Sequence, residues 1–385
     1  MFARTILATA EPPIPAARAW AARYDGRCGP ALDLTQAVPG YPPHPEMLAR
    51  LGAAAADPAC AGYGPITGDM ALREAVAEET RRLYGGTATA AHVAITAGAN
   101  LAFAMAMAVL AAPGDEVVLP TPWYFNHEMA LRMAGVTPVP LPCDPAAGFV
   151  PRVEDAPITP RTRAIVLVTP NNPTGATYPP ATIAAFAALC DRHGIALVLD
   201  ETYRDFLDTR PHALFSEGRR FVQLYSFSKA YCIPGHRLGA ILADAAFQAQ
   251  LAKALDTWQI CPARPGQAAL AWAIPALRDW RAGNRAVMAG RAAAARAALA
   301  GFQMEALGAY FAYLRLPEGA PDALAAAEFL AAEHGLMTLP GPFFGPGQQR
   351  HLRLAFANAE AARLAELPAR LAFTPATAPA RPAAG

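Results

Sequence analysis

Predicted strands and helices alternate through the middle of the chain, from about residue 92 to about residue 242. The strands are short apolar runs, which is typical of strands that are buried on both faces of a sheet. Strands are expected at 92–96, 116–119, 164–169, 195–199, 221–225 and 238–242, and helices at 71–84, 101–112, 127–134 and 181–193. This alternation predicts an α/β fold with a mostly parallel sheet and helices on both of its faces.

The pattern changes after about residue 278. A long Ala/Arg-rich helix is expected at roughly 281–300, followed by a strand at 310–316, an Ala-rich helix and a strand around Arg353. We interpret this part as a smaller α+β domain. The expected division is an N-terminal arm of residues 1–40 that belongs to the small domain, a large domain of residues 41–278, and a C-terminal small domain of residues 279–373. Residues 374–385 are rich in Pro and Ala and are expected to be a disordered tail.

Composition argues against several classes of protein. The net charge is +1 and there is no basic tract, so no nucleic-acid partner is expected. The longest apolar stretch, 101–112, is too short to span a membrane, so no membrane partner is expected. The six cysteines are scattered and the eight histidines show no metal spacing, which disfavours disulfides and a metal site and favours the cytoplasm.

A lysine stands where one of the buried strands ends. Ser226 and Lys229 follow the strand 221–225, and Arg237 follows eight residues after the lysine, between two glycines. A lysine amine can form an imine with an aldehyde, and a serine and an arginine can hold a phosphate. Pyridoxal 5'-phosphate (PLP) carries both groups. The motif alone leaves open the alternative of a solvated lysine at a strand end.

Two further strands end in polar side chains. Asn172 lies in the turn 170–175 after the strand 164–169, and Asp200 and Tyr203 follow the strand 195–199. In open α/β sheets, ligands bind at the carboxyl ends of the strands. We therefore expect these side chains and Lys229 to meet at one edge of the sheet.

The order Asn172, Asp200, Tyr203, Lys229 and Arg237 resembles the class I/II aminotransferases, which are fold-type I PLP enzymes. The resemblance extends from about residue 34 to residue 353. It implies a fold-type I PLP-transferase-like large domain and an enzyme that moves an amino group between an L-amino acid and a 2-oxo acid. The implied mechanism is ping-pong, with Lys229 as Schiff-base lysine and proton carrier. A PLP-dependent carbon–sulfur β-lyase, or another fold-type I PLP enzyme, is an alternative with the same residues. A non-catalytic PLP-binding regulatory domain is a less favoured one.

The resemblance also implies roles for individual residues. Lys229, Asp200 and Tyr203 would be catalytic, with Asp200 keeping the pyridine nitrogen of PLP protonated. Tyr124 would stack on the cofactor ring, with Trp123 as the second choice. The full set of cofactor-binding positions would be Gly98, Ala99, Asn100, Tyr124, Asn172, Asp200, Tyr203, Ser226, Lys229, Arg237 and, from a neighbouring subunit, Tyr63.

The implied substrate-binding residues are Arg353, Asn172 and Ala37. Arg353 lies inside an apolar strand, where a charge is costly to bury without an anionic partner, and it would bind the α-carboxylate. Ala37 stands where many relatives have glycine, which puts a close backbone approach there in doubt.

The contribution of Tyr63 to a neighbouring site would make the active form a homodimer with composite active sites. Aspartate-type enzymes have an arginine before the segment 261–267 that binds a side-chain carboxylate. This chain lacks one there, unless Arg264 substitutes. Together with Trp258 and Tyr41, this favours an amino donor with an apolar or aromatic side chain.

Overall fold

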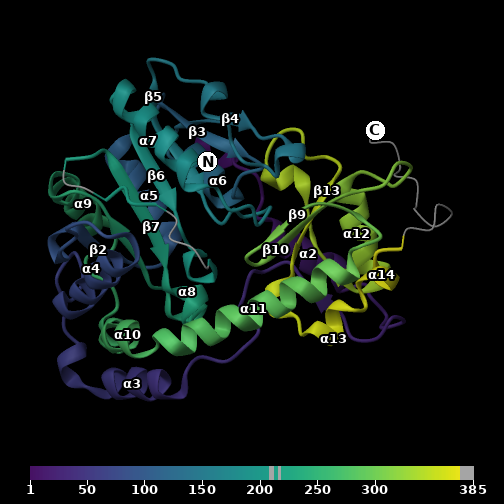
Figure 1. Cartoon of the computed structure of the whole chain (residues 1–385), viewed down its shortest axis with the longest axis horizontal. Coiled ribbons are helices and arrows are strands. Elements are labelled where there is room, and N and C mark those ends of the chain that lie inside the picture. Colours follow the sequence, from purple (N-terminus) through teal and green to yellow (C-terminus); the bar gives the residue numbers. More distant parts are fainter. Residues whose placement is uncertain (208–211, 216–217, 373–385) are drawn as a thin grey trace.

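The computed structural model describes residues 1–207, 212–215 and 218–372. Its largest sheet has seven strands in the order β2-β8-β7-β6-β5-β3-β4 (Figure 1). They are β2 (Val93–Thr96), β3 (Glu116–Thr121), β4 (Thr137–Pro142), β5 (Thr162–Val168), β6 (Ala196–Asp200), β7 (Phe221–Ser226) and β8 (Gly239–Leu242). Neighbouring strands are parallel, except that β8 is antiparallel to both β2 and β7. The α/β class and the mostly parallel sheet predicted from the sequence are confirmed.

Helices cover both faces of this sheet. They are α4 (Met70–Tyr84), α5 (Ala99–Leu110), α6 (Phe125–Met133), α7 (Pro180–His193), α9 (Ala245–Trp258) and α10 (Arg264–Ala276). Successive residues of a strand point to opposite faces. Val166 and Val198 accordingly pack in one apolar cluster with α5 and α9, and Leu167 and Leu199 pack in another with α7. This two-sided burial explains the continuous apolar runs in the sequence.

A smaller α+β unit is built around a four-stranded antiparallel sheet, in the order β12-β13-β10-β9. Its elements are β9 (Gln303–Gly308), β10 (Phe311–Arg315), α12 (Ala323–His334), β12 (Leu339–Pro340) and β13 (His351–Ala355). The N-terminal part of the chain joins this unit, because β1 (Leu32–Asp33) pairs in parallel with β11 (Leu336–Met337). The domain boundaries at 40, 278 and 373 stay predictions, and the tail 374–385 lies outside the described residues.

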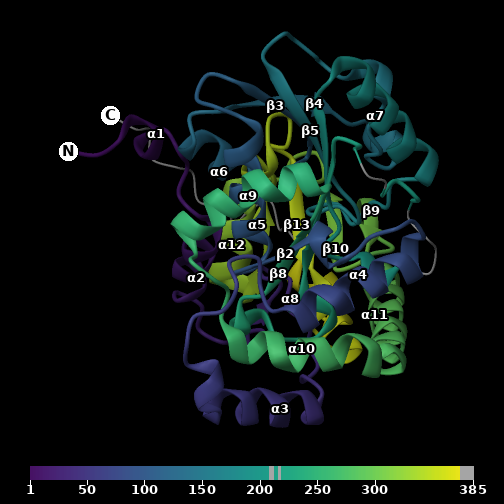
Figure 2. The ribbon, with the colours of Figure 1, turned by 90° about the vertical axis from the view of Figure 1, so that its left-hand side faces the viewer.

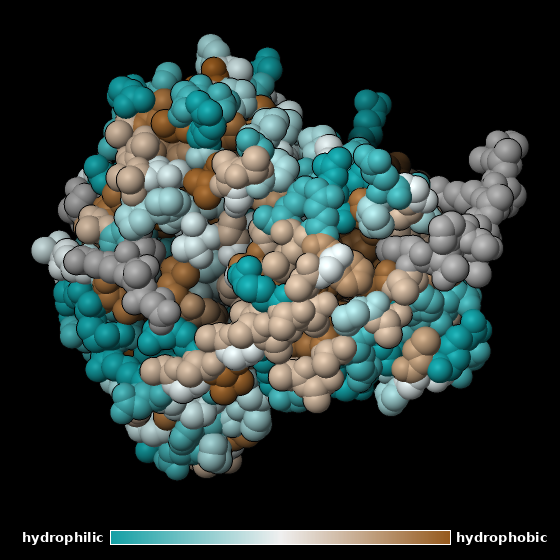
Figure 3. All heavy atoms as spheres, turned by 45° about the vertical axis from the view of Figure 1, so that its right-hand side comes forward, coloured by the Kyte–Doolittle hydropathy of each residue, from teal (hydrophilic) through white to brown (hydrophobic). Residues whose placement is uncertain are grey.

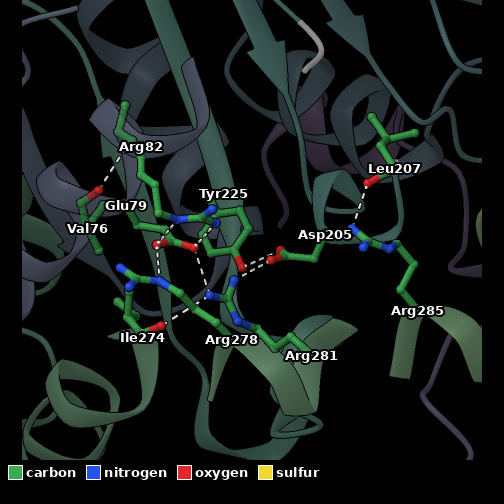
Figure 4. A network of polar contacts seen from close by, with 11 residues as sticks. Val76, Glu79, Arg82, Asp205, Leu207, Tyr225, Ile274, Arg278, Arg281 and Arg285 are labelled. Carbon is green, nitrogen blue, oxygen red and sulfur yellow. Dashed lines mark hydrogen bonds and ion pairs between the residues drawn. The ribbon is translucent and has the colours of Figure 1, made fainter. Parts of the chain in front are cut away.

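The long helix α11 (Arg278–Ala298) runs from the large sheet to the small unit (Figure 1). Its first turns are held by a buried polar network (Figure 4), in which Arg281 pairs with Glu79 at 2.7 Å and with Asp205 at 2.6 Å. Tyr225 of β7 donates a hydrogen bond to Asp205, and Arg278 also pairs with Glu79. Burial alone would raise the pKa of Glu79, but hydrogen bonds and charges from the surrounding arginines lower it to about 2. The network therefore ties α11 to both α4 and β7.

The remaining helices are short or peripheral. They are α1 (Arg4–Leu7), α2 (Pro13–Ala21), α3 (Pro45–Ala56), α8 (Phe227–Ala230), α13 (Ala361–Leu364) and α14 (Leu367–Arg370). Helix α1 lies at the periphery of the molecule, next to α6 (Figure 2). Weakly hydrophobic residues lie between hydrophilic ones on the surface (Figure 3), as expected for an Ala-rich chain with 16% charged residues. Within the described residues, no helix is both long and apolar enough to cross a membrane.

Several elements were not predicted. Strand β4 was missed because its segment Thr137–Pro142 contains three prolines, which are uncommon in strands. The prolines are tolerated because β4 is an edge strand of the sheet. Helices α9 and α10 and strand β9 were also missed. The predicted helices and strands between residues 71 and 242 are present, with ends that differ by a few residues.

Candidate active site

A cavity of about 320 Å³ lies at the carboxyl ends of the central strands, where the small unit meets the large one. It is lined by most of the residues singled out from the sequence, namely Ala37, Ala99, Asn100, Tyr124, Asn172, Asp200, Tyr203, Ser226, Lys229, Arg237 and Arg353. The ends of β5, β6 and β7 contribute Asn172, Asp200 and Lys229 side by side. A larger cavity of about 690 Å³ lies at the opposite ends of these strands and contains none of these residues.

Lys229 lies in α8, which begins directly after β7. The helix starts at this point because Ser226 caps it, with its Oγ accepting a hydrogen bond from the Ser228 backbone. The Lys229 Nζ donates a hydrogen bond to the carbonyl oxygen of Ala37. Burial, together with the charges of Arg237 and Arg353, lowers the pKa of Lys229 to about 8. A larger fraction of neutral amine is therefore present near pH 7 than for a free lysine, which favours imine formation.

Asp200 is the last residue of β6 and its carboxylate is held from two sides. Oδ2 lies 3.2 Å from His127 Nε2, and Oδ1 accepts hydrogen bonds from the backbone and the hydroxyl of Thr202, at 3.0 and 2.7 Å. Burial alone would raise the pKa of Asp200, but the bonds from His127 and Thr202 outweigh it and leave the pKa lowered. The His127 ring is itself stacked on Phe103. Asp200 is therefore a fixed, ionised carboxylate facing the cavity.

An anion can be bound at the start of α5. Gly98 precedes the helix with a φ of +90°, and a Cβ atom there would lie 2.9 Å from the guanidinium carbon of Arg237. The first N–H groups of a helix have no partner within the helix, so Ala99 and Asn100 supply donors beside this arginine. Glycine is favoured here because its φ is positive, and a side chain at this position would displace the guanidinium of Arg237.

An aromatic side chain borders the same part of the cavity. The hydroxyl of Tyr124 accepts a hydrogen bond from Asn126 at 2.9 Å and donates one to Asn100 at 3.3 Å. These bonds fix the ring at the cavity wall. Trp123, the second choice for ring stacking, is buried in the core and does not line the cavity.

Arg353 reaches the cavity from β13 of the small unit. Its Nη1 donates to Asn172 Oδ1 at 3.0 Å, and its Nη2 donates to the carbonyl oxygen of Thr35. The guanidinium also lies over the rings of Phe311 and Phe344. Among the residues described, Arg353 Nε has no hydrogen-bond partner although the side chain is 2% exposed. Burial lowers the pKa of Arg353 to about 10. A buried arginine without a carboxylate partner indicates a site for an anionic ligand.

Tyr63 does not line the cavity, and 84% of its surface is exposed. Trp258 is likewise 71% exposed, and Tyr41 packs against Trp280 outside the cavity. The Arg264 side chain pairs with Asp69 at 3.4 Å, so it does not enter the site of its own chain.

The structure adds residues that were not predicted from the sequence. Ile14 of α2 and Phe125 of α6 line the cavity. His127 was expected near the site from the sequence as a polar lining residue, and its contact with Asp200 is new. No sequence signal marks Ile14, because α2 reaches the cavity only through its packing on the small unit.

This fold, with a lysine, a carboxylate and an anion site at the carboxyl ends of the strands, defines a PLP-dependent enzyme of fold type I. Residues 31–371 match the family model described as aminotransferase class I and II. The chain belongs to this family, and it is a PLP-dependent aminotransferase that acts by a ping-pong mechanism.

Individual relatives agree with this assignment. An aromatic aminotransferase of Arabidopsis thaliana is 30% identical over 88% of this chain and 88% of its own length. The aspartate/prephenate aminotransferase of Thermus thermophilus is 33% identical over 77% of this chain and 79% of its own length. The solved structure of Thermus thermophilus aspartate aminotransferase with maleate covers 96% of this chain and 98% of that chain, with a TM-score of 0.87 and 28% identity. These names favour transamination over β-elimination and over a non-catalytic domain.

Proposed function

We propose that Lys229, Asp200 and Tyr203 are the catalytic residues of this aminotransferase, and that Arg353 and Asn172 bind the α-carboxylate of the substrate. The observation that carries this proposal is the Nε of Arg353, which has no partner within the described part of the chain and lies in the same cavity as the buried amine of Lys229. An α-amino acid has a carboxylate and an amine on one carbon. The guanidinium of Arg353 would bind the carboxylate, and the amine and Cα would then lie toward Lys229.

The donor set of the cavity fits PLP. Asp200 would lie at the pyridine nitrogen, and Ala99, Asn100, Ser226 and Arg237 would hold the phosphate. When bound, PLP supplies the electron sink that stabilises negative charge at the substrate Cα. In this proposal the free amine of Lys229 would accept the proton from this carbon. Its depressed pKa supports that role, because a neutral amine is needed to accept a proton.

The amino donor is proposed to be monocarboxylic, with an apolar or aromatic side chain. The cations among the lining residues are Lys229, Arg237 and Arg353. Their proposed roles are imine formation, phosphate binding and α-carboxylate binding, so none is left for a second carboxylate. Ile14 and Phe125 offer apolar contacts in the same cavity. A second carboxylate would lose its hydration without gaining a partner, at a cost of several kcal/mol.

The purified PLP form should react faster with phenylalanine or leucine than with aspartate in a single half-reaction. We expect about a hundredfold or larger difference in kcat/KM, since each 1.36 kcal/mol is a factor of about ten. The measurement is the shift of the cofactor absorbance to the pyridoxamine form. Aspartate reacting faster than every apolar amino acid would refute the donor assignment. Arg264→Ala would then show whether this arginine, from a neighbouring subunit, is the compensating cation.

The active unit is proposed to be a cytoplasmic homodimer in which Tyr63 completes the phosphate site of the partner. Apolar side chains exposed near this residue support the proposal, since Tyr63, Met70, Trp258 and Ile260 are 84%, 53%, 71% and 49% exposed. The loop of Tyr63 adjoins the segment after α9, because the Gly64 backbone donates to Cys261 Sγ at 3.4 Å. An apolar surface of this kind is typical of a subunit interface. The free state of all six cysteines supports a reducing compartment.

Two inactive variants, Lys229→Ala and Tyr63→Asp, should restore activity when their subunits are exchanged. In the mixed dimer one site receives both defects and the other receives neither. With random exchange, half of the dimers are mixed and one of their two sites is intact, so about a quarter of wild-type activity should return.

The matched control is Lys229→Ala mixed with Asp200→Ala, where both lost residues serve the chain that carries them. That pair should recover nothing. If exchange is verified and the Tyr63 pair also recovers nothing, the composite site is wrong.

A further inference from the structure

The backbones of two glycines, one from each unit, touch beside the cavity. Gly175 follows β5 in the turn that contains Asn172, and Gly308 is the last residue of β9. A Cβ atom on Gly308 would collide with the carbonyl oxygen of Gly175 and lie 3.2 Å from its carbonyl carbon. A Cβ atom on Gly175 would lie 2.8 Å from the carbonyl carbon of Gly308. Neither position has room for a side chain without moving the two units apart.

On the large-sheet side, Gly175 belongs to a rigid turn. The Gly175 backbone donates to the carbonyl of Asn171 at 2.8 Å, and the Asn171 backbone donates to Ala176 at 2.7 Å. The Asn171 side chain accepts hydrogen bonds from the backbone and hydroxyl of Thr174, at 3.1 and 2.8 Å. These bonds make the turn a single body, so Gly175 and Asn172 move together.

On the small-sheet side, Gly308 is linked to Arg353 through one strand. Gly308 pairs with Phe311 of β10, and β10 pairs in turn with β13, where Tyr313 lies opposite Arg353. The ring of Phe311 lies 5.1 Å below the guanidinium of Arg353. A displacement of Gly308 is therefore carried to the arginine by a paired sheet and a packed ring.

We propose that the contact between Gly175 and Gly308 sets the spacing of Asn172 and Arg353 and thereby shapes the pocket for the substrate α-carboxylate. Both glycines are positioning residues, since neither lines the cavity. The turn of Gly175 and the small sheet of Gly308 are also joined by the 3.0 Å hydrogen bond between Asn172 and Arg353. This inference rests on the proposed role of Arg353 as the carboxylate-binding residue.

The test is Gly308→Ala, assayed in the half-reaction with phenylalanine and with phenethylamine, which lacks the carboxylate. We expect kcat/KM for phenylalanine to fall about ten- to a hundredfold, mainly through KM, because misplacing a binding group by about 1 Å costs up to about a hundredfold. The rate with phenethylamine and the absorbance of the bound cofactor should be unchanged. Gly301→Ala is the matched control, since a Cβ there meets nothing within 4 Å.

A second pair makes the test independent of the folding of one variant. Gly175→Ala disturbs the same contact from the large-sheet side. Gly194→Ala is its control, because Gly194 also has a positive φ (+65°, against +77° for Gly175) but a Cβ there meets nothing within 4 Å. The Gly175 variant should show the same selective loss and the Gly194 variant should not.

Equal losses for phenylalanine and phenethylamine in both variants, or no loss in either, would overturn the inference. Arg353→Leu in the same assay distinguishes failure of the glycine spacing role from failure of the carboxylate-binding role of Arg353. If that substitution is selective for phenylalanine and the glycine variants are not, the carboxylate site stands and the spacing role of the glycines falls. If Arg353→Leu also lowers the rates with phenylalanine and phenethylamine equally, the proposed carboxylate-binding role of Arg353 is wrong, and the inference about the glycines falls with it.

Discussion

Asp200→Ala is expected to bind PLP and to lose the half-reaction with amino acids almost completely. In the proposed site the carboxylate would hold the pyridine nitrogen in its protonated form, and without that charge the cofactor would be a poor electron sink. We expect a fall of roughly a thousandfold or more, which corresponds to about 4 kcal/mol of transition-state stabilisation. Single-turnover absorbance measurements with phenylalanine would quantify the loss.

Cofactor attachment separates this effect from a failure to fold. Borohydride reduction and peptide mapping should tag Lys229 in both Asp200→Ala and the wild type, and leave Lys253, the chain's one other lysine, unlabelled. Thr202→Val removes one of the hydrogen bonds to Asp200 and should cost much less. Near-normal turnover of Asp200→Ala, or a tag on Lys253, would show that the site is wrongly assigned.

Arg353→Leu should reduce kcat/KM for amino acids by about 30- to 5000-fold, which is about 2–5 kcal/mol for truncating one partner of a buried charge pair. The physical reason is that Arg353 is fully charged at neutral pH, buried, and without a carboxylate partner among the described residues. Binding of PLP should persist, because Arg353 belongs to the small unit and the phosphate site to the large one.

The specificity of the Arg353 effect can be measured with a substrate that lacks the carboxylate. The rate with phenethylamine should change little, whereas the rate with phenylalanine should fall. Arg315→Leu, which removes a half-exposed arginine from the neighbouring strand β10, should leave both rates close to normal. A loss of the same size for both substrates would mean that Arg353 supports the fold of the site and does not bind the carboxylate.

The sequence by itself determined the α/β class and the edge of the sheet where the site lies. Strands such as 164–169 and 195–199 are buried on both faces of the sheet, so nearly all of their residues are apolar and the strands can be recognised in the sequence. Parallel strands carry their carboxyl ends to the same edge, and this brought Asn172, Asp200 and Lys229 together as predicted. The roles assigned to these residues stay predictions.

The tertiary structure decided which side chains from outside the sheet complete the cavity. The reversed direction of β8, the edge strand β4 and the arrival of Ile14 depend on packing between segments far apart in sequence. The meeting of Arg353 with Asn172, and of Gly308 with Gly175, joins positions more than a hundred residues apart. Local propensity and hydrophobic period act over a few residues, whereas these distances are set by how two units pack against each other.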